Sequence, residues 1–568
     1  MGIMVPRMVT IGQGALRGRA CTDERISAFL GIPYGEPPVG DLRWRAPRPA
    51  AGWTGVRDAM EFGPAPIQAT AAEDARGCSL GIEGEETSED CLRLNVWTPA
   101  PIADGTADPD AKLPVMVWFY GGGNQYGSTA DGRYRGEWLA GEGVVVVSVE
   151  YRTNVFGFFA HPRIDGRGDG PDGGDAPCAN FGYLDQRLAL LWVRRNIAAF
   201  GGDPGNVTIF GFSSGASSVV AHLCSPMSAG LFRRAISQSG AGVGQANRKL
   251  NTLAEARTIG ERFVRDVLGA RDLAQARTMD AHELLMAMIE QPPLLDGPYA
   301  FTGWDLMLNC PVCVDGRFLT MNIPKSFALG RVNPCDLIAG VTAEEFIAGP
   351  PDRSPRGLAA YAEETFGERA SDYLDACRAD GGATGCCTTG DGTTDGMTDG
   401  IGSAGGRGID GGVSDGRATI GCDPTYNLFA AGNAAMCDLL LANTPVRPYF
   451  YRFSRTPGGD PDGHAGHGSE LPYVFGSALA CEPHRYDGAD WDLSRAMRRY
   501  WANFAATGNP NGMRDGERGV RDLPRWERCS PGSRDAMDFG RSGPTMVRDW
   551  LKPTELVAAE WHAAHAAD

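Results

Sequence analysis

Two nearly continuous apolar runs restrict the fold of this chain more than any other feature. PVMVWFY covers residues 114–120, and GVVVVSV covers residues 143–149. Strands that are covered on both faces, as in a parallel sheet between helices, have this composition. The alternation of such strands with helical stretches predicts an α/β fold with a large, mostly parallel central sheet. Further strands are expected at 207–211, 234–239, 336–341 and 448–454.

The first hundred residues follow another pattern. VTIGQGALRG (9–18), ISAFLGIPY (26–34) and CLRLNVW (91–97) are short β-rich segments broken by Gly and Pro turns. Short strands joined by such turns are typical of antiparallel pairing. We therefore expect a small antiparallel sheet at the N-terminus.

One segment does not have the composition of a packed domain. Residues 381–417 are rich in Gly, Asp and Thr and contain almost no large apolar side chain. Such a segment cannot offset its ordering entropy by burial, which predicts a flexible surface insertion. A calcium-binding loop is the alternative, because GGRGIDGGV (405–413) is similar to one Gly-Asp repeat, yet stacks of such repeats need several copies.

Charge and cysteine content exclude several classes of function. The 53 basic and 70 acidic residues give a net charge of −17, which disfavours nucleic acid and anionic membranes as partners. The chain shows no apolar stretch of about 18 residues and no secretory signal in its first ten residues, so a cytoplasmic protein is expected. The 15 cysteines are scattered, as reduced thiols would be, and Cys310 and Cys313 lack the second pair that a zinc site needs. No metal is expected.

A serine motif supplies the first chemistry. Gly211, Phe212, Ser213, Ser214 and Gly215 follow the strand VTIFG directly and precede a segment that can form a helix. GxSxG between a strand and a helix exposes the serine on a tight turn as a nucleophile. An ordinary glycine turn is the alternative interpretation. A second glycine run, 121–123, ends the apolar strand before it and can aim backbone N–H groups at an oxyanion.

A nucleophilic serine needs a histidine base and a carboxylate that orients it. Among eight histidines, position relative to the serine and to predicted helices leaves three candidates, His464, His467 and His484. Glu344 and Glu345 follow a predicted strand end and are the candidate acids, but their spacing does not choose between them.

These residues resemble those of the type B carboxylesterases, the family that includes the cholinesterases. The resemblance rests on FLGIPYGEPPVGDLRWRAP (29–47), SEDCLRLNVW (88–97), residues 180–216 around the serine, and GHGSELPYVFG (466–476). It implies an α/β-hydrolase fold, one domain over residues 1–568 that contains the insertion 381–417, and no cofactor. It also implies that a small-molecule ester is cleaved through an acyl-enzyme intermediate.

The resemblance assigns roles to individual residues. It places the nucleophile at Ser213, the base at His467 and the acid at Glu345. Backbone N–H groups of Gly122, Gly123 and Ser214 would form the oxyanion hole. An amidase or lactonase using the same three side chains, and a non-catalytic binding protein on the same fold, are the alternative functions.

The chain also departs from the family pattern. Phe212 stands where an acidic or polar residue usually precedes the nucleophile, Asn124 replaces an aromatic, and Phe346 replaces a glycine, so these three residues are expected to shape the substrate pocket. Cys91 is present at a family disulfide position, but its usual partner position holds Pro66, with Cys78 as a substitute.

Overall fold

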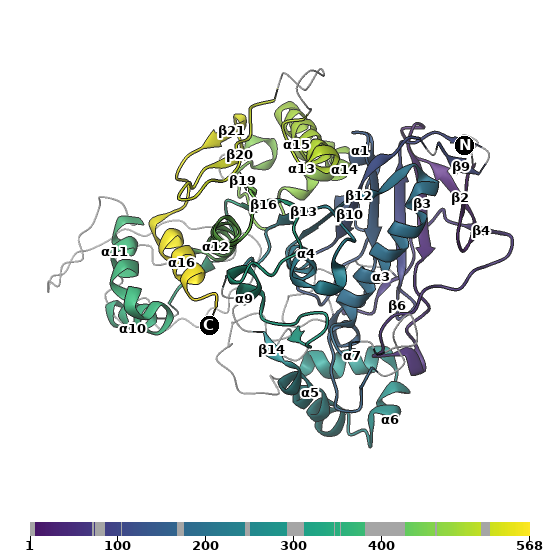
Figure 1. The fold of residues 1–568 in the computed structure, drawn as a ribbon, viewed down its shortest axis with the longest axis horizontal. Coiled ribbons are helices and arrows are strands. Elements are labelled where there is room, and N and C mark those ends of the chain that lie inside the picture. Colours follow the sequence, from purple (N-terminus) through teal and green to yellow (C-terminus); the bar gives the residue numbers. More distant parts are fainter. Residues whose placement is uncertain are drawn as a thin grey trace.

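A computed structural model gives the arrangement of the chain (Figure 1). Its dominant element is one large sheet of thirteen strands, in which β4 pairs with β2 outside the main path. The structure describes residues 6–70, 73, 86–103, 105–108, 110–166, 175, 177–244, 250–291, 312–345, 347–350, 352, 354–380, 426–460, 463–512 and 523–567. The predicted insertion 381–417 lies outside these residues.

The strands of the sheet run in the order β1-β2-β3-β7-β11-β10-β12-β13-β16-β19-β20-β21. Strands β10, β11, β12, β13, β16, β19 and β20 pair in parallel, and β1, β2, β3 and β7 pair antiparallel at the N-terminal edge of the same sheet. In chain order the strands are β1 (Pro6–Ile11), β2 (Gly14–Ala20), β3 (Ser27–Pro33), β4 (Val56–Asp58), β7 (Arg93–Thr98), β10 (Leu113–Phe119), β11 (Val145–Val149), β12 (Gly202–Phe212), β13 (Arg234–Gln238), β16 (Asp336–Thr342), β19 (Tyr449–Phe453), β20 (Ala536–Gly540) and β21 (Gly543–Val547).

Helices cover both faces of this sheet (Figure 1). The longer ones are α3 (Phe181–Asn196), α4 (Ser214–Cys224), α5 (Leu253–Arg262), α7 (Ala281–Glu290), α10 (Pro355–Phe366), α11 (Ala370–Asp380), α12 (Leu428–Asn443), α15 (Gly488–Thr507) and α16 (Pro553–Ala564). The shorter ones are α1 (Glu137–Ala140), α2 (Asn154–Gly157), α6 (Leu273–Arg277), α9 (Ile323–Ala328), α13 (Leu471–Phe475) and α14 (Ser477–Cys481). Short strand pairs outside the main sheet are β5 (Ala65–Pro66) with β6 (Thr87–Ser88), β8 (Ile102–Ala103) with β9 (Thr106–Ala107), β14 (Asn251–Thr252) with β15 (Cys313–Val314), and β17 (Ile347–Ala348) with β18 (Tyr426–Asn427).

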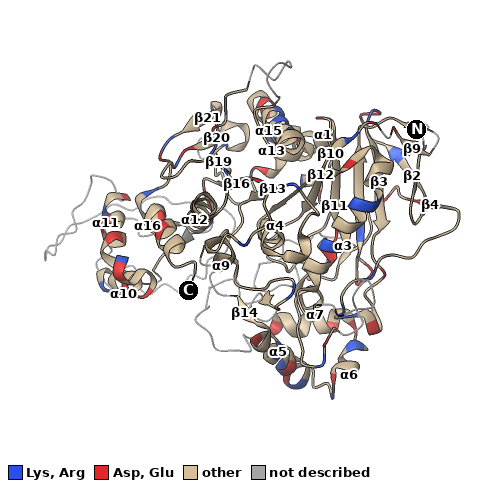
Figure 2. Ribbon diagram, viewed as in Figure 1, with Lys and Arg blue, Asp and Glu red and all other residues tan. Residues whose placement is uncertain are grey.

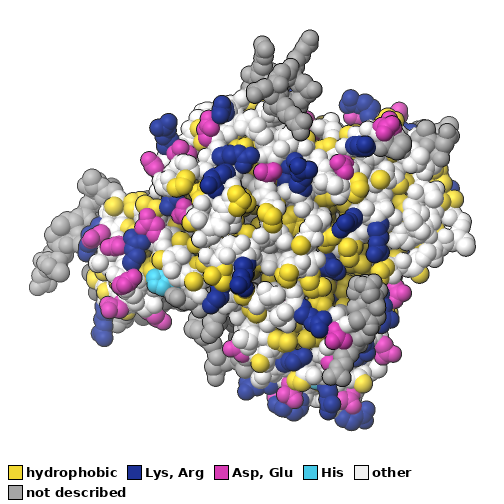
Figure 3. Space-filling model, in the orientation of Figure 1, with side chains coloured by type: hydrophobic (Ala, Val, Ile, Leu, Met, Phe, Trp, Pro, Cys, Tyr) yellow, Lys and Arg dark blue, Asp and Glu magenta, His cyan; other side chains and the backbone are white. Residues whose placement is uncertain are grey.

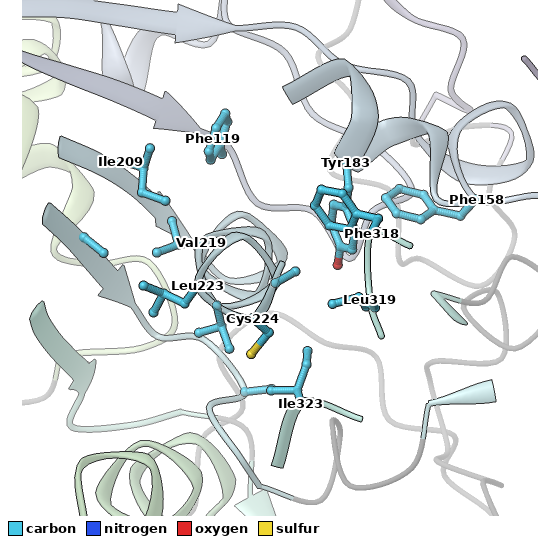
Figure 4. Close-up of a cluster of buried hydrophobic side chains, with 14 of the residues drawn as sticks. Phe119, Phe158, Tyr183, Ile209, Val219, Leu223, Cys224, Phe318, Leu319 and Ile323 are labelled. Carbon is cyan, nitrogen blue, oxygen red and sulfur yellow. The ribbon is translucent and has the colours of Figure 1, made fainter. Parts of the chain in front are cut away.

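Strand β10 shows why its sequence is apolar throughout. Val115, Val117 and Phe119 join one core, which includes residues of α3, α4, α12 and α16, whereas Met116 and Trp118 join a second core with residues of α13 and α15. Successive side chains of a strand point to opposite faces, so a strand between two cores needs apolar residues at every position. Figure 4 shows the first core around α4, with Phe119 and Ile209 from the sheet near Val219 and Leu223 of the helix.

Charged side chains lie outside these cores. Figure 2 shows them concentrated on outer helices such as α5, α6, α10 and α11, while the central strands β10, β12 and β13 are almost free of them. On the face drawn in Figure 3, basic and acidic side chains are interspersed with hydrophobic ones. The C-terminal helix α16 contributes to the core: Trp561 and His562 are 5% and 3% exposed because the helix packs against α11 and α12.

The parallel strands place their carboxyl ends on one edge of the sheet. Residues that follow β10, β12, β13, β16 and β19 therefore meet there, although they come from distant parts of the sequence. Open α/β sheets bind ligands at this edge.

Candidate active site

Ser213 lies on a strained turn between β12 and α4. Its backbone has φ 57° and ψ −122°, a conformation that side-chain-bearing residues rarely adopt. The turn is held because the Ser213 N–H donates to the carbonyl of Gln238, at 2.9 Å. A Cβ on Gly215 would lie 2.1 Å from the carbonyl oxygen of Phe119, so only glycine fits there. The predicted strand–serine–helix context is thus present, and the ordinary-turn alternative does not explain the strain.

The second glycine run lies directly against this serine. A Cβ on Gly121 would be 2.9 Å from the Cβ of Ser213. Gly122 and Gly123 both have positive φ, at 110° and 63°, a backbone conformation that residues with a side chain rarely adopt. The N–H of Ser214, at the first position of α4, is also next to the serine. The structure thus places the start of the glycine run, at Gly121, beside Ser213.

A hydrogen bond joins Nδ1 of His467 to Oε2 of Glu345. Glu345 follows β16 and its side chain is fully buried, whereas the His467 side chain is 18% exposed. The other carboxylate oxygen, Oε1, accepts the Thr342 N–H at 2.9 Å. Burial acts to raise the pKa of Glu345, but the nearby His467 and the hydrogen bonds from Ser239 and Thr342 hold it below its usual value. The carboxylate is therefore ionised and fixes the imidazole.

Glu344 and the other histidines have other partners or lie at the surface. His464 and Glu344 pair with each other at half-exposed positions beside the Glu345–His467 pair. His484 lies exposed in a short 3-10 helix, Pro483–Arg485. His222 is buried on α4, where its ring contacts Ser228 Oγ at 2.7 Å and Gln186 Oε1 at 3.2 Å. Of the candidate acids and bases, Glu345 and His467 are the two that form a buried carboxylate–imidazole pair.

Aromatic rings surround the imidazole. The Phe212 ring is 4.5 Å from the His467 ring, centroid to centroid, and 8% exposed. Phe429, at the start of α12, is 5.3 Å from the same ring. Asn124 follows the glycine run with φ 60° and is 4% exposed. Of the three predicted pocket residues, Phe212 thus lies against His467, Asn124 is buried directly after the glycine run, and Phe346 is outside the described residues.

A buried carboxyl group lies behind the Glu345–His467 pair, and sequence reasoning missed it. Glu470 has no exposed surface, and its Oε1 accepts from Gln238 Nε2 at 3.4 Å. Gln238 in turn accepts from the Trp501 indole N–H at 3.2 Å. Burial, followed by the negative charge of Glu345, raises the pKa of Glu470 to about 7. The sequence signal that could have identified Glu470 is its position in HGSEL, three residues after His467.

The described residues contain no group of three or more His, Cys, Asp or Glu that would hold a metal ion. Cys91 is a buried free thiol, and Cys78 and Cys310 are outside the described part of the chain. No helix in the described ranges is long and apolar enough to cross a membrane.

Comparison with known proteins shows the family of the chain. The model of the carboxylesterase family matches residues 5–370 and 424–555. The chain belongs to that family. Fumonisin B1 esterase of Sphingopyxis macrogoltabida is similar to this carboxylesterase, with 34% identity over 550 residues that cover 94% of this chain and 87% of the relative.

Solved structures of esterases superpose on this carboxylesterase along almost its whole length. A PNB esterase has a TM-score of 0.70 at 28% identity, covering 97% of this chain and 99% of its own. A carboxylesterase of Geobacillus stearothermophilus has a TM-score of 0.67 at 28% identity, with the same coverage. The expected α/β-hydrolase fold and the expected carboxylic ester hydrolase activity are both confirmed.

Proposed function

We propose that Ser213, His467 and Glu345 carry the ester hydrolysis of this enzyme. Ser213 Oγ attacks the ester carbonyl while His467 Nε2 takes the hydroxyl proton, which gives a tetrahedral oxyanion. The imidazolium then protonates the leaving alcohol, and the carbonyl re-forms as an acyl-enzyme on Ser213. Water, deprotonated by His467, attacks the acyl carbon and releases the acid and the free serine.

Two further groups of the site support this proposal, the backbone N–H groups of the oxyanion hole and the Glu345 carboxylate. In this mechanism the backbone N–H groups of Gly122, Gly123 and Ser214 stabilise the oxyanion, and removing one such donor typically costs about 2.7–4 kcal/mol of barrier. Glu345 holds the imidazole at Nδ1, so that Nε2 is the nitrogen that takes the proton, and it stabilises the imidazolium. The observation that carries the proposal is the bond between the buried Glu345 carboxylate and His467 Nδ1, at the sheet edge where Ser213 lies.

The substrates of the family are small-molecule esters, and we propose that esters rather than amides or lactones are preferred here. The similarity to two esterases of known structure supports this choice. A p-nitrophenyl ester and the matched p-nitroanilide, assayed in parallel, would test it, because both share the acyl chemistry and differ only in the leaving group.

Replacement of the serine tests the assignment itself. Ser213→Ala should abolish hydrolysis of the p-nitrophenyl ester, and Ser217→Ala, one turn along α4, is the matched control that should stay active. Full activity of Ser213→Ala would refute the role of this serine. Loss of activity in both variants would point to damage to the helix.

We also propose that residues 1–568 form one domain with 381–417 as an insertion. Strands β16 and β19, which precede and follow that segment, are neighbours in the same sheet, and the family match is interrupted between 370 and 424. A variant lacking 381–417 should keep its ester hydrolysis.

A reducing, cytoplasmic location fits the free thiols of the described cysteines, and cell fractionation would test it.

A further inference from the structure

A second acid–histidine pair lies beside the first and joins the same two loops. His464 Nδ1 and Glu344 Oε2 are 2.5 Å apart, and their side chains are 55% and 50% exposed. Glu344 immediately precedes Glu345, and His464 precedes His467 by three residues. The loop after β16 and the loop after β19 are therefore linked by an inner, buried pair and an outer, exposed pair.

The backbone at the outer pair is linked as well. The Glu344 N–H donates to the carbonyl of Ala465 at 3.1 Å, and Glu344 and Gly466 form a parallel β-bridge. The Ala465 N–H lies 3.4 Å from Glu344 Oε1. One carboxylate thus contacts both a side chain and a backbone group of the histidine loop.

This arrangement explains how adjacent glutamates have different environments. In extended backbone, successive side chains point to opposite sides, so the bridge at Glu344 turns Glu345 inward and leaves Glu344 at the surface. A slip of the two loops by one residue would exchange these environments. Whatever fixes the register at Glu344 also fixes where Glu345 meets His467.

We infer that Glu344 and His464 form a positioning pair, which holds the histidine loop in register so that His467 stays aligned with Glu345 and Ser213. The inference rests on the proposed function. The pair does not touch the substrate; its contribution reaches the reaction through the orientation of the imidazole. Small misplacements of a catalytic group lower the rate of the chemical step more than the affinity for substrate.

An exposed ion pair without any role is the competing interpretation, since such pairs commonly contribute little. This chain provides a matched control. His282 and Glu73 form another exposed pair, with Nε2 and Oε1 at 3.3 Å and side chains 53% and 36% exposed. Glu73 precedes β6 and His282 belongs to α7, so neither belongs to the loops that carry Glu345 and His467.

The test is a double-mutant cycle on the p-nitrophenyl ester, with kcat, KM and melting temperature measured for each variant. His464→Ala and Glu344→Ala should each lower kcat about two- to fivefold, the range expected from an exposed pair, with KM unchanged. The double variant should be no slower than the single ones, because each single change already breaks the pair. His464→Asn retains a donor near the position of Nδ1 and should recover most of the kcat, and His282→Ala should match the unmodified enzyme.

Each other outcome overturns the inference. A kcat equal to that of the unmodified enzyme in His464→Ala, or additive losses in the double variant, would show that the two residues do not act together. A fall in melting temperature that accounts for the lost activity, without recovery in His464→Asn, would show a purely structural role. Failure of the proposed function is distinguishable, because it would appear as activity that survives Ser213→Ala.

Discussion

His467 and Glu345 are joined through Nδ1 and a carboxylate that has no exposed surface. An imidazole held at Nδ1 presents Nε2 to its other side, and this is the nitrogen that a serine hydroxyl needs as a base. The partners come from loops that are 122 residues apart in sequence and meet because β16 and β19 are adjacent parallel strands.

Glu345→Gln should lower kcat by about 10³–10⁴ while the fold is retained. The amide is nearly the same size as the carboxylate, but it neither stabilises the imidazolium nor enforces the productive tautomer, and such a change has about this effect in serine hydrolases. Steady-state kinetics on a p-nitrophenyl ester would measure it, with circular dichroism as the control for folding. A loss of less than tenfold would contradict the role given to Glu345.

Glu470→Gln should change how stability depends on pH. Burial and the charge of Glu345 raise the folded-state pKa of Glu470 to about 7, above the value of an unfolded glutamate. Between these two values the folded state binds the extra proton, so this group makes the protein less stable as pH rises toward 7. The glutamine variant lacks that penalty.

Melting temperatures from pH 5 to pH 8 would measure the effect of Glu470. The variant should come nearest to the unmodified enzyme at pH 5 and become relatively more stable as pH rises. A difference that does not vary with pH would show that Glu470 titrates normally.

Gly215→Ala should both destabilise and inactivate the enzyme. The added Cβ would lie 2.1 Å from the Phe119 carbonyl oxygen, which is backbone and cannot turn aside, so the turn that carries Ser213 must move. Forced overpacking of this kind typically costs about 1–3 kcal/mol. Gly132→Ala is the matched control, since a Cβ there meets nothing within 4 Å. Thermal unfolding and esterase activity should separate the two variants.

Asp185→Asn should be strongly destabilising. Asp185 forms an ion pair with Arg152 at 2.8 Å, and the two side chains are 0% and 3% exposed. Removing one partner leaves a buried charge without compensation, which costs about 3–5 kcal/mol. Asp492→Asn, in an exposed pair with Arg495, should change the free energy of unfolding by less than about 1 kcal/mol. Chemical denaturation of both variants would compare them.

The strands and the nucleophile were predictable from the sequence because their signals are local. The strand β10 is apolar at every position, and GFSSG spans the end of β12 and the start of α4, with Ser213 between them. Both features depend on neighbours in the chain, so no tertiary information was needed to find them.

The choice of acid and base was not predictable from local pattern. Glu344 and Glu345 are adjacent, and which of them points inward depends on the β-bridge to Gly466, more than 100 residues away. The choice of Glu345 and His467 came only from the family resemblance. The contacts of Phe429, Gln238 and Trp501 at the site were not predictable, because they are long-range and have no sequence motif.

Covalent labelling tests the central claim most directly. A fluorophosphonate reacts with a serine only when the serine is activated, so the enzyme should take up one equivalent, and peptide mass spectrometry should place the adduct on Ser213. Ser213→Ala should remain unlabelled, whereas Ser217→Ala should be labelled like the unmodified enzyme. An adduct on another serine, or labelling of Ser213→Ala at the rate of the unmodified enzyme, would contradict the account.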